Sequence, residues 1–302
     1  MNKIFAITIL GVFLLVFIVC SNGETTSTTS EIDTTNMYKL ANFLSEEERE
    51  QIANEPFGDS ITRTKGIIPV PQPQDDFRFT NLDTVYWHGQ NVQNSDFRAS
   101  SFRSANCSEG NFSGSDFRAA DIRWTKFDNS DLTNCNFRQA KLFHVHVNDA
   151  DLSNCDFRGA NMFGMEGHRT NMRDTKLTNA LLKDVEFLYS NFTGTVGIKS
   201  RFIRAVLMHS ILDSCDFSYC DFTGAGMEYA RFRNTNFTGA NFQGTHLQKA
   251  DFTGADLKDC NFFAAELDST IFKDAKNIPK SIKKMLVNGV ATGVVSEGSN
   301  KH

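Results

Sequence analysis

Large apolar residues recur at every fifth position from Phe77 to Phe272. Nineteen of these forty central positions are Phe and eleven are Leu, and the register never slips by a residue. Only Cys107, Gly167 and Gly197 break the large-apolar rule. An α-helix repeats every 3.6 residues and a two-faced strand every two, so neither can use a period of five. The pattern therefore predicts a repeat protein.

The residues around each centre follow a second rule. The residue two positions earlier is small, as at Ala120 and Ala150, and the residue directly before is usually Asp or Asn, as at Asp131 and Asn191. This unit resembles the Ala-Asp/Asn-Leu/Phe-x-x motif of the pentapeptide-repeat family over residues 75–275. The resemblance implies an all-β fold, a right-handed quadrilateral parallel β-helix with four units per coil. Forty units would then make about ten coils, each rising about 4.8 Å.

Columns at a spacing of twenty residues support a coil of four units. The five centres from Phe77 to Phe157 at this spacing are each preceded by Asp or Asn and followed by Arg. These arginines are Arg78, Arg98, Arg118, Arg138 and Arg158. Such a column could hold an extended anion, or the neighbouring Asp column could neutralise it in a lattice of weak surface ion pairs.

The N-terminus carries the pattern of an export signal. Lys3 precedes an apolar run from Ile4 to Val19, and small polar residues follow, which is typical of a signal peptide over residues 1–23. An extracytoplasmic location, secreted or periplasmic, is therefore expected. Cys20 leaves a lipid anchor open, and a retained signal would act as a membrane anchor.

The segments that flank the repeat are predicted to be short and mixed. Residues 24–74 are expected to form a flexible tether, a short helix with a capping box at Ser45 and Glu48, and a Pro-rich linker. Residues 276–302 are expected to form a capping helix over 280–287 and a disordered tail. Within the repeat, Gly167 and Gly197 are each predicted to leave a void and to weaken the middle coils.

Six cysteines lie in the repeat, and all substitute for core residues. Cys107 takes a centre, and the others take the small position: Cys135, Cys155, Cys215, Cys220 and Cys260. Buried thiols are expected. Cys135 and Cys155 would lie one coil apart, within disulfide range, so a bridge between them stays open.

No residue pattern points to catalysis. The chain shows no Ser/His/Asp or Cys/His constellation, Gly-rich phosphate loop or zinc-type Cys spacing. His146, Glu166 and Glu186 would share one outward column, which is a candidate metal site on an open surface. The sequence favours chance proximity there, so neither a metal, a cofactor nor an enzyme activity is predicted.

Outward positions directly after the centre carry several apolar residues. Phe143, Phe163 and Ile203 would share one face, and Leu188 and Met208 the next. Exposed apolar patches mark interaction surfaces. Partner binding or self-association is expected there.

Charge narrows the function further. A net charge of −5 argues against a strongly basic nucleic-acid binder and against a heavily acidic imitation of DNA. The first hypothesis is an exported, non-catalytic scaffold that acts through protein–protein contact, with no nucleic-acid partner. The resemblance implies an alternative, a DNA-mimicking regulator of an enzyme such as gyrase. A surface ligand or metal binder is the third hypothesis.

Overall fold

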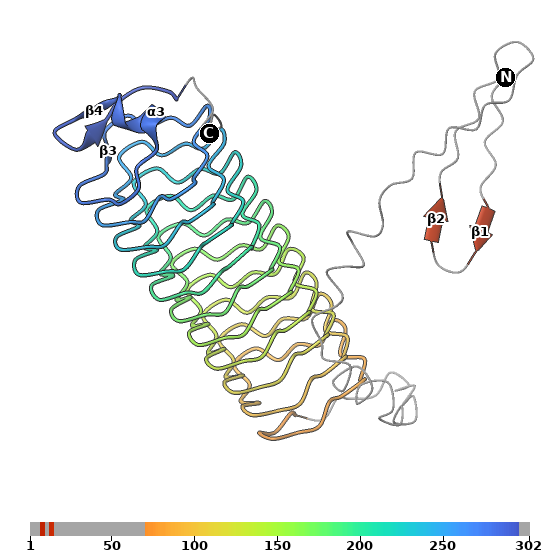
Figure 1. Ribbon diagram of the computed structural model, residues 1–302. Coiled ribbons are helices and arrows are strands. Elements are labelled where there is room, and N and C mark those ends of the chain that lie inside the picture. Colours follow the sequence, from red (N-terminus) through yellow and green to blue (C-terminus); the bar gives the residue numbers. More distant parts are fainter. Residues whose placement is uncertain (1–6, 10–11, 15–69, 296–302) are drawn as a thin grey trace, which may run out of the picture. The chain divides into compact units, whose positions relative to one another are not determined.

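The computed structural model describes residues 7–9, 12–14 and 70–295 (Figure 1). The chain divides into two units, Met1–Asn42 and Phe43–His302. In the first unit, strands β1 (Ile7–Ile9) and β2 (Val12–Leu14) pair antiparallel. The rest of the predicted signal peptide, and the tether, helix and linker expected before residue 70, lie outside the described residues. In the described part, no helix is both long and apolar enough to span a bilayer.

From Asp76 to Lys276, the described part of the second unit is a coil in which every turn takes twenty residues (Figure 1). Parallel bridges join the residue before each centre to the residue twenty positions later, from Asp76 with Asp96 to Asp256 with Lys276. The N–H of Phe97 donates to the carbonyl of Asp116 at 2.7 Å, and each following unit repeats the arrangement. The predicted coil of four pentapeptides is confirmed.

The coil has four faces, each built from the units at one position of the turn. The first face is centred on Phe77 and every twentieth residue after it, the second on Leu82, the third on Trp87 and the fourth on Val92. Along any face, neighbouring coils present residues that differ by twenty in number. This numbering rule places every outward side chain in a column parallel to the coil axis.

The core consists of the central side chains stacked coil upon coil. The rings of Phe97 and Phe117 are both fully buried and lie parallel, with centroids 4.6 Å apart. Small residues fill the corners, and their polar atoms are satisfied by the backbone. The hydroxyl of Ser130, for example, donates to the carbonyl of Cys107 at 2.9 Å. The result is a close-packed apolar interior in which the hydroxyl groups of the small corner residues are hydrogen-bonded.

Each corner depends on two local features. The Asp or Asn before the centre accepts a hydrogen bond from the backbone two residues later, as Asp131 does from the N–H of Thr133 at 2.9 Å. Such side-chain bonds to the backbone stabilise tight turns. The last residue of most units has a positive φ, as at Asn154 with 61°. Gly, Asn and Asp adopt that left-handed conformation at the lowest cost.

The voids predicted at Gly167 and Gly197 are not found. A Cβ on Gly167 would lie 2.2 Å from Cε1 of Phe187, and one on Gly197 would lie 2.6 Å from Cε1 of Phe217. The Phe of the next coil therefore occupies the space that the missing side chain leaves. The prediction of a void at each glycine was wrong because it considered each centre without its neighbour along the axis.

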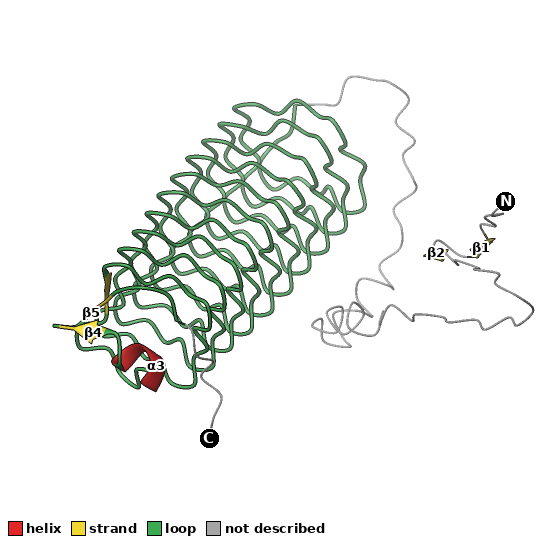
Figure 2. Cartoon of the chain, turned by 90° about the horizontal axis from the view of Figure 1, so that it is seen from above, coloured by secondary structure: helices red, strands yellow, loops and turns green. Residues whose placement is uncertain are grey.

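The C-terminal end is closed by a short helix and a hairpin (Figure 2). Helix α3 (Lys280–Lys283) is shorter than the helix expected over 280–287, although its Ile282 is fully buried as the pattern required. The chain then forms β4 (Leu286–Val287) and β5 (Val290–Ala291), and β5 pairs antiparallel with β3 (Thr270–Ile271) of the last coil.

The hairpin supplies the acceptors that the last coil lacks. The N–H of Phe272 donates to the carbonyl of Gly289 at 2.8 Å, and that of Ala264 donates to Val295 at 2.7 Å. The disorder expected from about residue 291 was therefore wrong up to Val295, which is buried. An open end of the coil would expose unpaired strand edges, and this segment covers them.

The six described cysteines are free thiols, and all are buried. The thiols of Cys135 and Cys155 each donate to a backbone carbonyl, of Phe112 at 3.1 Å and of Leu132 at 2.9 Å. Burial raises the pKa of Cys215 to about 12 and that of Cys220 to about 12. Thiolate, the reactive form, is thus disfavoured in the folded chain.

Gly167→Ala is expected to destabilise the coil by about 1–3 kcal/mol, because the new methyl group overlaps the Phe187 ring. Gly226→Ala is the matched control, since its Cβ would meet only the flexible Glu228 side chain, at 3.3 Å. Thermal and urea unfolding followed by circular dichroism would measure both. Equal unfolding midpoints for the two variants would contradict the proposed packing.

The Cys20→Ser variant removes the one cysteine outside the repeat. The folded variant is expected not to react with Ellman's reagent. After denaturation without reductant, six thiols are expected to react. Burial of all six sulfur atoms keeps the reagent away from them and disfavours the reactive thiolate form. Appearance of only four thiols in denaturant would instead indicate a bridge between Cys135 and Cys155.

Candidate interaction surfaces

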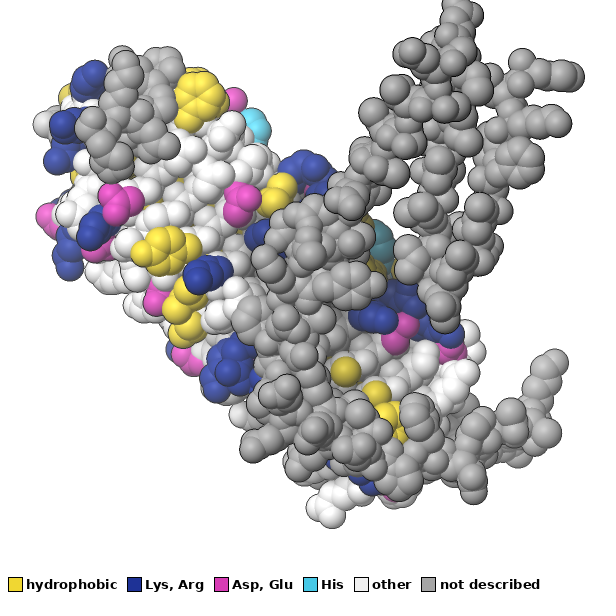
Figure 3. All heavy atoms as spheres, turned by 45° about the vertical axis from the view of Figure 1, so that its right-hand side comes forward, with side chains coloured by type: hydrophobic (Ala, Val, Ile, Leu, Met, Phe, Trp, Pro, Cys, Tyr) yellow, Lys and Arg dark blue, Asp and Glu magenta, His cyan; other side chains and the backbone are white. Residues whose placement is uncertain are grey.

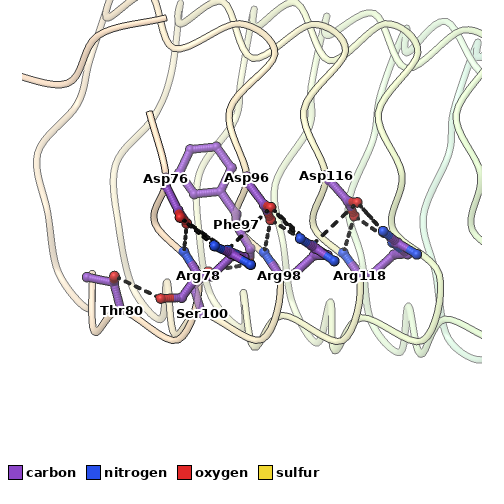
Figure 4. A network of polar contacts seen from close by, with 9 residues as sticks. All are labelled: Asp76, Arg78, Thr80, Asp96, Phe97, Arg98, Ser100, Asp116 and Arg118. Carbon is purple, nitrogen blue, oxygen red and sulfur yellow. Dashed lines mark hydrogen bonds and ion pairs between the residues drawn. The ribbon is translucent and has the colours of Figure 1, made fainter. Parts of the chain in front are cut away.

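The five predicted arginines form one column on the first face, beside a column of four Asp and one Asn. Figure 4 shows the first three, Arg78, Arg98 and Arg118, next to their aspartates. The guanidinium of Arg98 binds the carboxylate of Asp96, two residues earlier, at 2.7 Å. Its Nε also faces Asp116 of the next coil at 3.9 Å. Arg78, Arg118 and Arg158 repeat the pairing with their own aspartates. These arginines are thus paired with neighbouring carboxylates in an ion-pair lattice, which is the alternative to anion binding that the sequence offered.

The lattice lowers the pKa of two of its carboxyl groups, those of Asp76 and Asp156. The hydrogen bond from Arg78 is the main cause that holds the pKa of Asp76 below its ordinary value. Burial alone would raise the pKa of Asp156, but hydrogen bonds from the side chain and backbone of Arg158 outweigh it and lower that pKa as well. Both carboxyl groups therefore stay charged to lower pH than in an unfolded chain.

In the column directly before the third-face centres, histidine and glutamate meet at two places. Nδ1 of His146 lies 3.2 Å from a carboxylate oxygen of Glu166, as the shared column predicted, and Glu186 follows one coil later. Sequence reasoning missed a second pair in the same column, His246 and Glu266, also at 3.2 Å. Among the described residues, no three His, Cys, Asp or Glu side chains are placed to hold a metal ion.

Apolar and aromatic side chains gather on the second face. The rings of Phe143 and Phe163 are in edge contact, with centroids 6.2 Å apart, which confirms the predicted neighbours. Ile203 lies two coils further along and is half-buried. Trp124, one coil before Phe143, is 50% exposed and belongs to the same surface. We call these four residues the second-face patch.

The third face carries a separate group at its outer corner. Tyr189, His209 and Tyr229 stack as parallel rings, with centroids 4.7 Å apart at each step. Nζ of Lys249 continues the column 4.9 Å from the Tyr229 ring and donates to its hydroxyl at 3.0 Å. We call these four residues the third-face ladder. The predicted residues Leu188 and Met208 are half-buried in the adjoining column.

Sequence reasoning missed the ladder and Trp124 because it considered only the position directly after each centre. The corner position, one residue further on, also points outward: Tyr189 and Tyr229 are 60% and 47% exposed. Reading the corner column at a spacing of twenty residues would have placed Tyr189, His209 and Tyr229 together. Figure 3 shows how hydrophobic side chains emerge between charged ones on the face in view.

Comparisons with known proteins agree with the architecture. A family model described as pentapeptide repeats (8 copies) matches residues 88–118, 95–134 and 120–159, and one described as a pentapeptide repeat region matches 198–272. HetL from the cyanobacterium Nostoc, a pentapeptide repeat protein involved in heterocyst differentiation regulation, is 20% identical. The match covers 82% of this chain and 98% of HetL, with a TM-score of 0.52.

Two other solved structures share less of the coil. QnrB1, a plasmid-mediated fluoroquinolone resistance protein, is 20% identical. The match covers 56% of this chain and 85% of the QnrB1 chain, with a TM-score of 0.29. Rfr23 from the cyanobacterium Cyanothece is 19% identical. The match covers 37% of this chain and 86% of the Rfr23 chain, with a TM-score of 0.30. No curated protein matches the sequence.

The fold is a right-handed quadrilateral parallel β-helix. The chain belongs to the pentapeptide-repeat family. Members of this family are generally structural or interaction proteins without catalytic activity.

Acid is expected to weaken the first-face lattice. Because the folded pKa of Asp156 lies below the ordinary 3.8, its stabilisation is complete above that value and is lost as pH falls through the folded pKa. Asp156→Asn should therefore lower stability at pH 7 by less than about 1 kcal/mol and reduce the loss on acidification.

Asp131→Asn is the control for this measurement, since Asp131 accepts from the Thr133 N–H and has no ion pair in the described part of the chain. Thermal unfolding between pH 2 and 7, a range that spans the ordinary Asp pKa of about 3.9, would compare the two. An identical pH dependence for Asp156→Asn and the parent would contradict the assignment.

Proposed function

We propose that this chain is an exported, non-catalytic scaffold that acts through protein–protein contact. The observation that carries the proposal is the third-face ladder with its neighbours Leu188 and Met208. Tyr and other aromatic residues, together with Met, are enriched at the centres of protein interfaces, where charged residues are depleted. Export rests on the signal pattern of residues 1–23, which directs the scaffold outside the cytoplasm.

Backbone strain supports a selected surface rather than an accidental one. Tyr189, His209 and Tyr229 adopt φ values of 57°, 59° and 59°. Bulky residues are rare in this conformation, and strained positions cluster where function needs them. Asn or Gly occupies equivalent corners at Asn154 and Gly224, with less strain. Three bulky side chains on successive coils of this corner column are therefore better explained by contact with a partner than by the stability of the turns.

The ladder is also arranged for recognition by side chains. Backbone groups along the faces are engaged between coils, as where the Tyr229 N–H donates to Gln248 at 3.0 Å, so a partner gains little by adding a strand. The ring stack holds Tyr189, His209 and Tyr229 in fixed positions before binding. Preorganised rings bind a partner with a smaller loss of side-chain entropy.

A photo-crosslinking amino acid at position 229 of the full chain is expected to capture one defined protein, or a second copy of this chain, in the native host. The same amino acid at Thr193 on the fourth face is the control. Tyr189→Ser should weaken the captured contact about tenfold or more in a purified binding assay, because an anchor ring is lost.

Circular dichroism would establish that Tyr189→Ser still folds. Equal crosslinking from positions 229 and 193, or none from either, would contradict the proposal. Export is tested separately by fractionating the host and sequencing the mature N-terminus, where recovery of the intact signal in the cytosol would contradict it.

A further inference from the structure

Positive charge exceeds negative charge along the second face. Its outward positions between residues 101 and 204 hold two carboxylates, Asp121 and Asp184, and six cations: Arg103, Arg123, Lys141, Lys183, Arg201 and Arg204. This excess occurs on a chain whose net charge is −5. The face is therefore an electropositive strip on a mildly acidic protein.

Half of these cations are neutralised locally. Their ion pairs join Arg103 to Asp83 at 2.5 Å, Arg123 to Asp121 at 2.6 Å and Arg204 to Asp184 at 2.6 Å. Lys141, Lys183 and Arg201 form no ion pair within the part of the chain that the structure describes. Asp221, one coil beyond Arg201, accepts instead from the backbone and hydroxyl of Thr223. Three positive charges thus remain for a ligand.

The surplus charges are interleaved with the second-face patch. The backbone N–H of Trp124 donates to the carbonyl of Phe143 at 2.9 Å, and that of Gly164 donates to the carbonyl of Lys183 at 3.1 Å. Rings and cations therefore follow one another along this face. Nζ of Lys183 lies 5.9 Å from the Phe163 ring centroid. Contact with a ring holds this ammonium near the face and keeps it available to an anion.

We propose that the second face binds an extended acidic polysaccharide, a polymer of uronate sugars. Its carboxylates would pair with Lys141, Lys183 and Arg201, and the apolar faces of its sugar rings would pack on Trp124 and Phe163. Coils follow one another at about 4.8 Å. Lys141 and Lys183 lie two coils apart on this face, and Lys183 and Arg201 lie one coil apart, so carboxylates spaced along an extended polymer can meet them in turn.

Other anionic polymers fit this strip less well. An extended peptide would bind best by adding a strand, but the backbone groups of this face are engaged between coils, as between Trp124 and Phe143. Single-stranded nucleic acid carries a dense row of phosphates and is held by many cations along a groove. Three surplus cations on a face without a groove do not provide that arrangement.

The test uses the full chain and polygalacturonate, titrated at low salt. The triple variant Lys141→Ala, Lys183→Ala, Arg201→Ala is expected to bind about tenfold more weakly or worse, because its charge contacts are lost. A control triple variant removes three exposed lysines on other faces: Lys176→Ala, Lys258→Ala and Lys273→Ala. The control has the same net charge and should stay within about twofold of the parent.

Trp124 supplies an independent readout. The chain has two tryptophans, of which Trp124 is 50% exposed and Trp87 is 4% exposed. Acrylamide should quench Trp124 in the free protein, and bound polygalacturonate should protect it. Trp124→Phe should abolish that protection, and circular dichroism would show that this variant folds.

Three results would overturn the proposal: no binding of polygalacturonate, equal weakening by both triple variants, or tighter binding of polyglutamate or single-stranded poly(dT) to this face. Tyr189→Ser should bind polygalacturonate as the parent does. Failure of this proposal is therefore separate from failure of the protein contact proposed for the third-face ladder.

Discussion

Registered stacking of one twenty-residue coil on the next is the constraint on which the rest of this structure depends. From Phe77 to Leu257, each central N–H donates to a carbonyl nineteen residues further on, as Phe97 does to Asp116 and Phe117 does to Asn136, both at 2.7 Å. A slip of one residue would bring Asp or Asn into the interior in place of Phe or Leu. Burial of an unpaired carboxylate is far more costly than loss of one hydrogen bond, so the register is strongly specified.

The same constraint explains what the sequence could predict and what it could not. The period of five located every central residue, and the period of twenty assigned Phe143 to Phe163 and His146 to Glu166 as neighbours. Packing between coils was harder to predict. The space at Gly167 is filled by Phe187, a residue twenty positions away whose ring orientation no spacing rule contains.

The C-terminal end shows a second limit of pattern reasoning. The apolar spacing around Ile282 is helical and correctly indicates a buried face, but α3 ends after one turn. The last coil leaves backbone N–H groups without a following coil, and residues 289–295 satisfy them. Tertiary hydrogen bonding thus overrides a weak local helical preference. The last coil needs these acceptors because no further coil follows it. The sequence of the tail alone does not reveal that need.

The division between interior and exterior explains how one coil can carry unlike surfaces. Central and small positions are used by the core, so outward positions vary with little effect on the fold. The first face uses this freedom for an ion-pair lattice, the second for cations among rings, and the third for the Tyr189–His209–Tyr229 stack. Trp124 lies at the corner between the second and third faces, and the ladder lies at the corner between the third and fourth. Since the two groups occupy opposite corners of the third face, a polymer on one does not cover the rings of the other. The two proposed partners would therefore bind separate surfaces at a distance set by the register of the coil, which is the physical requirement of the proposed scaffold.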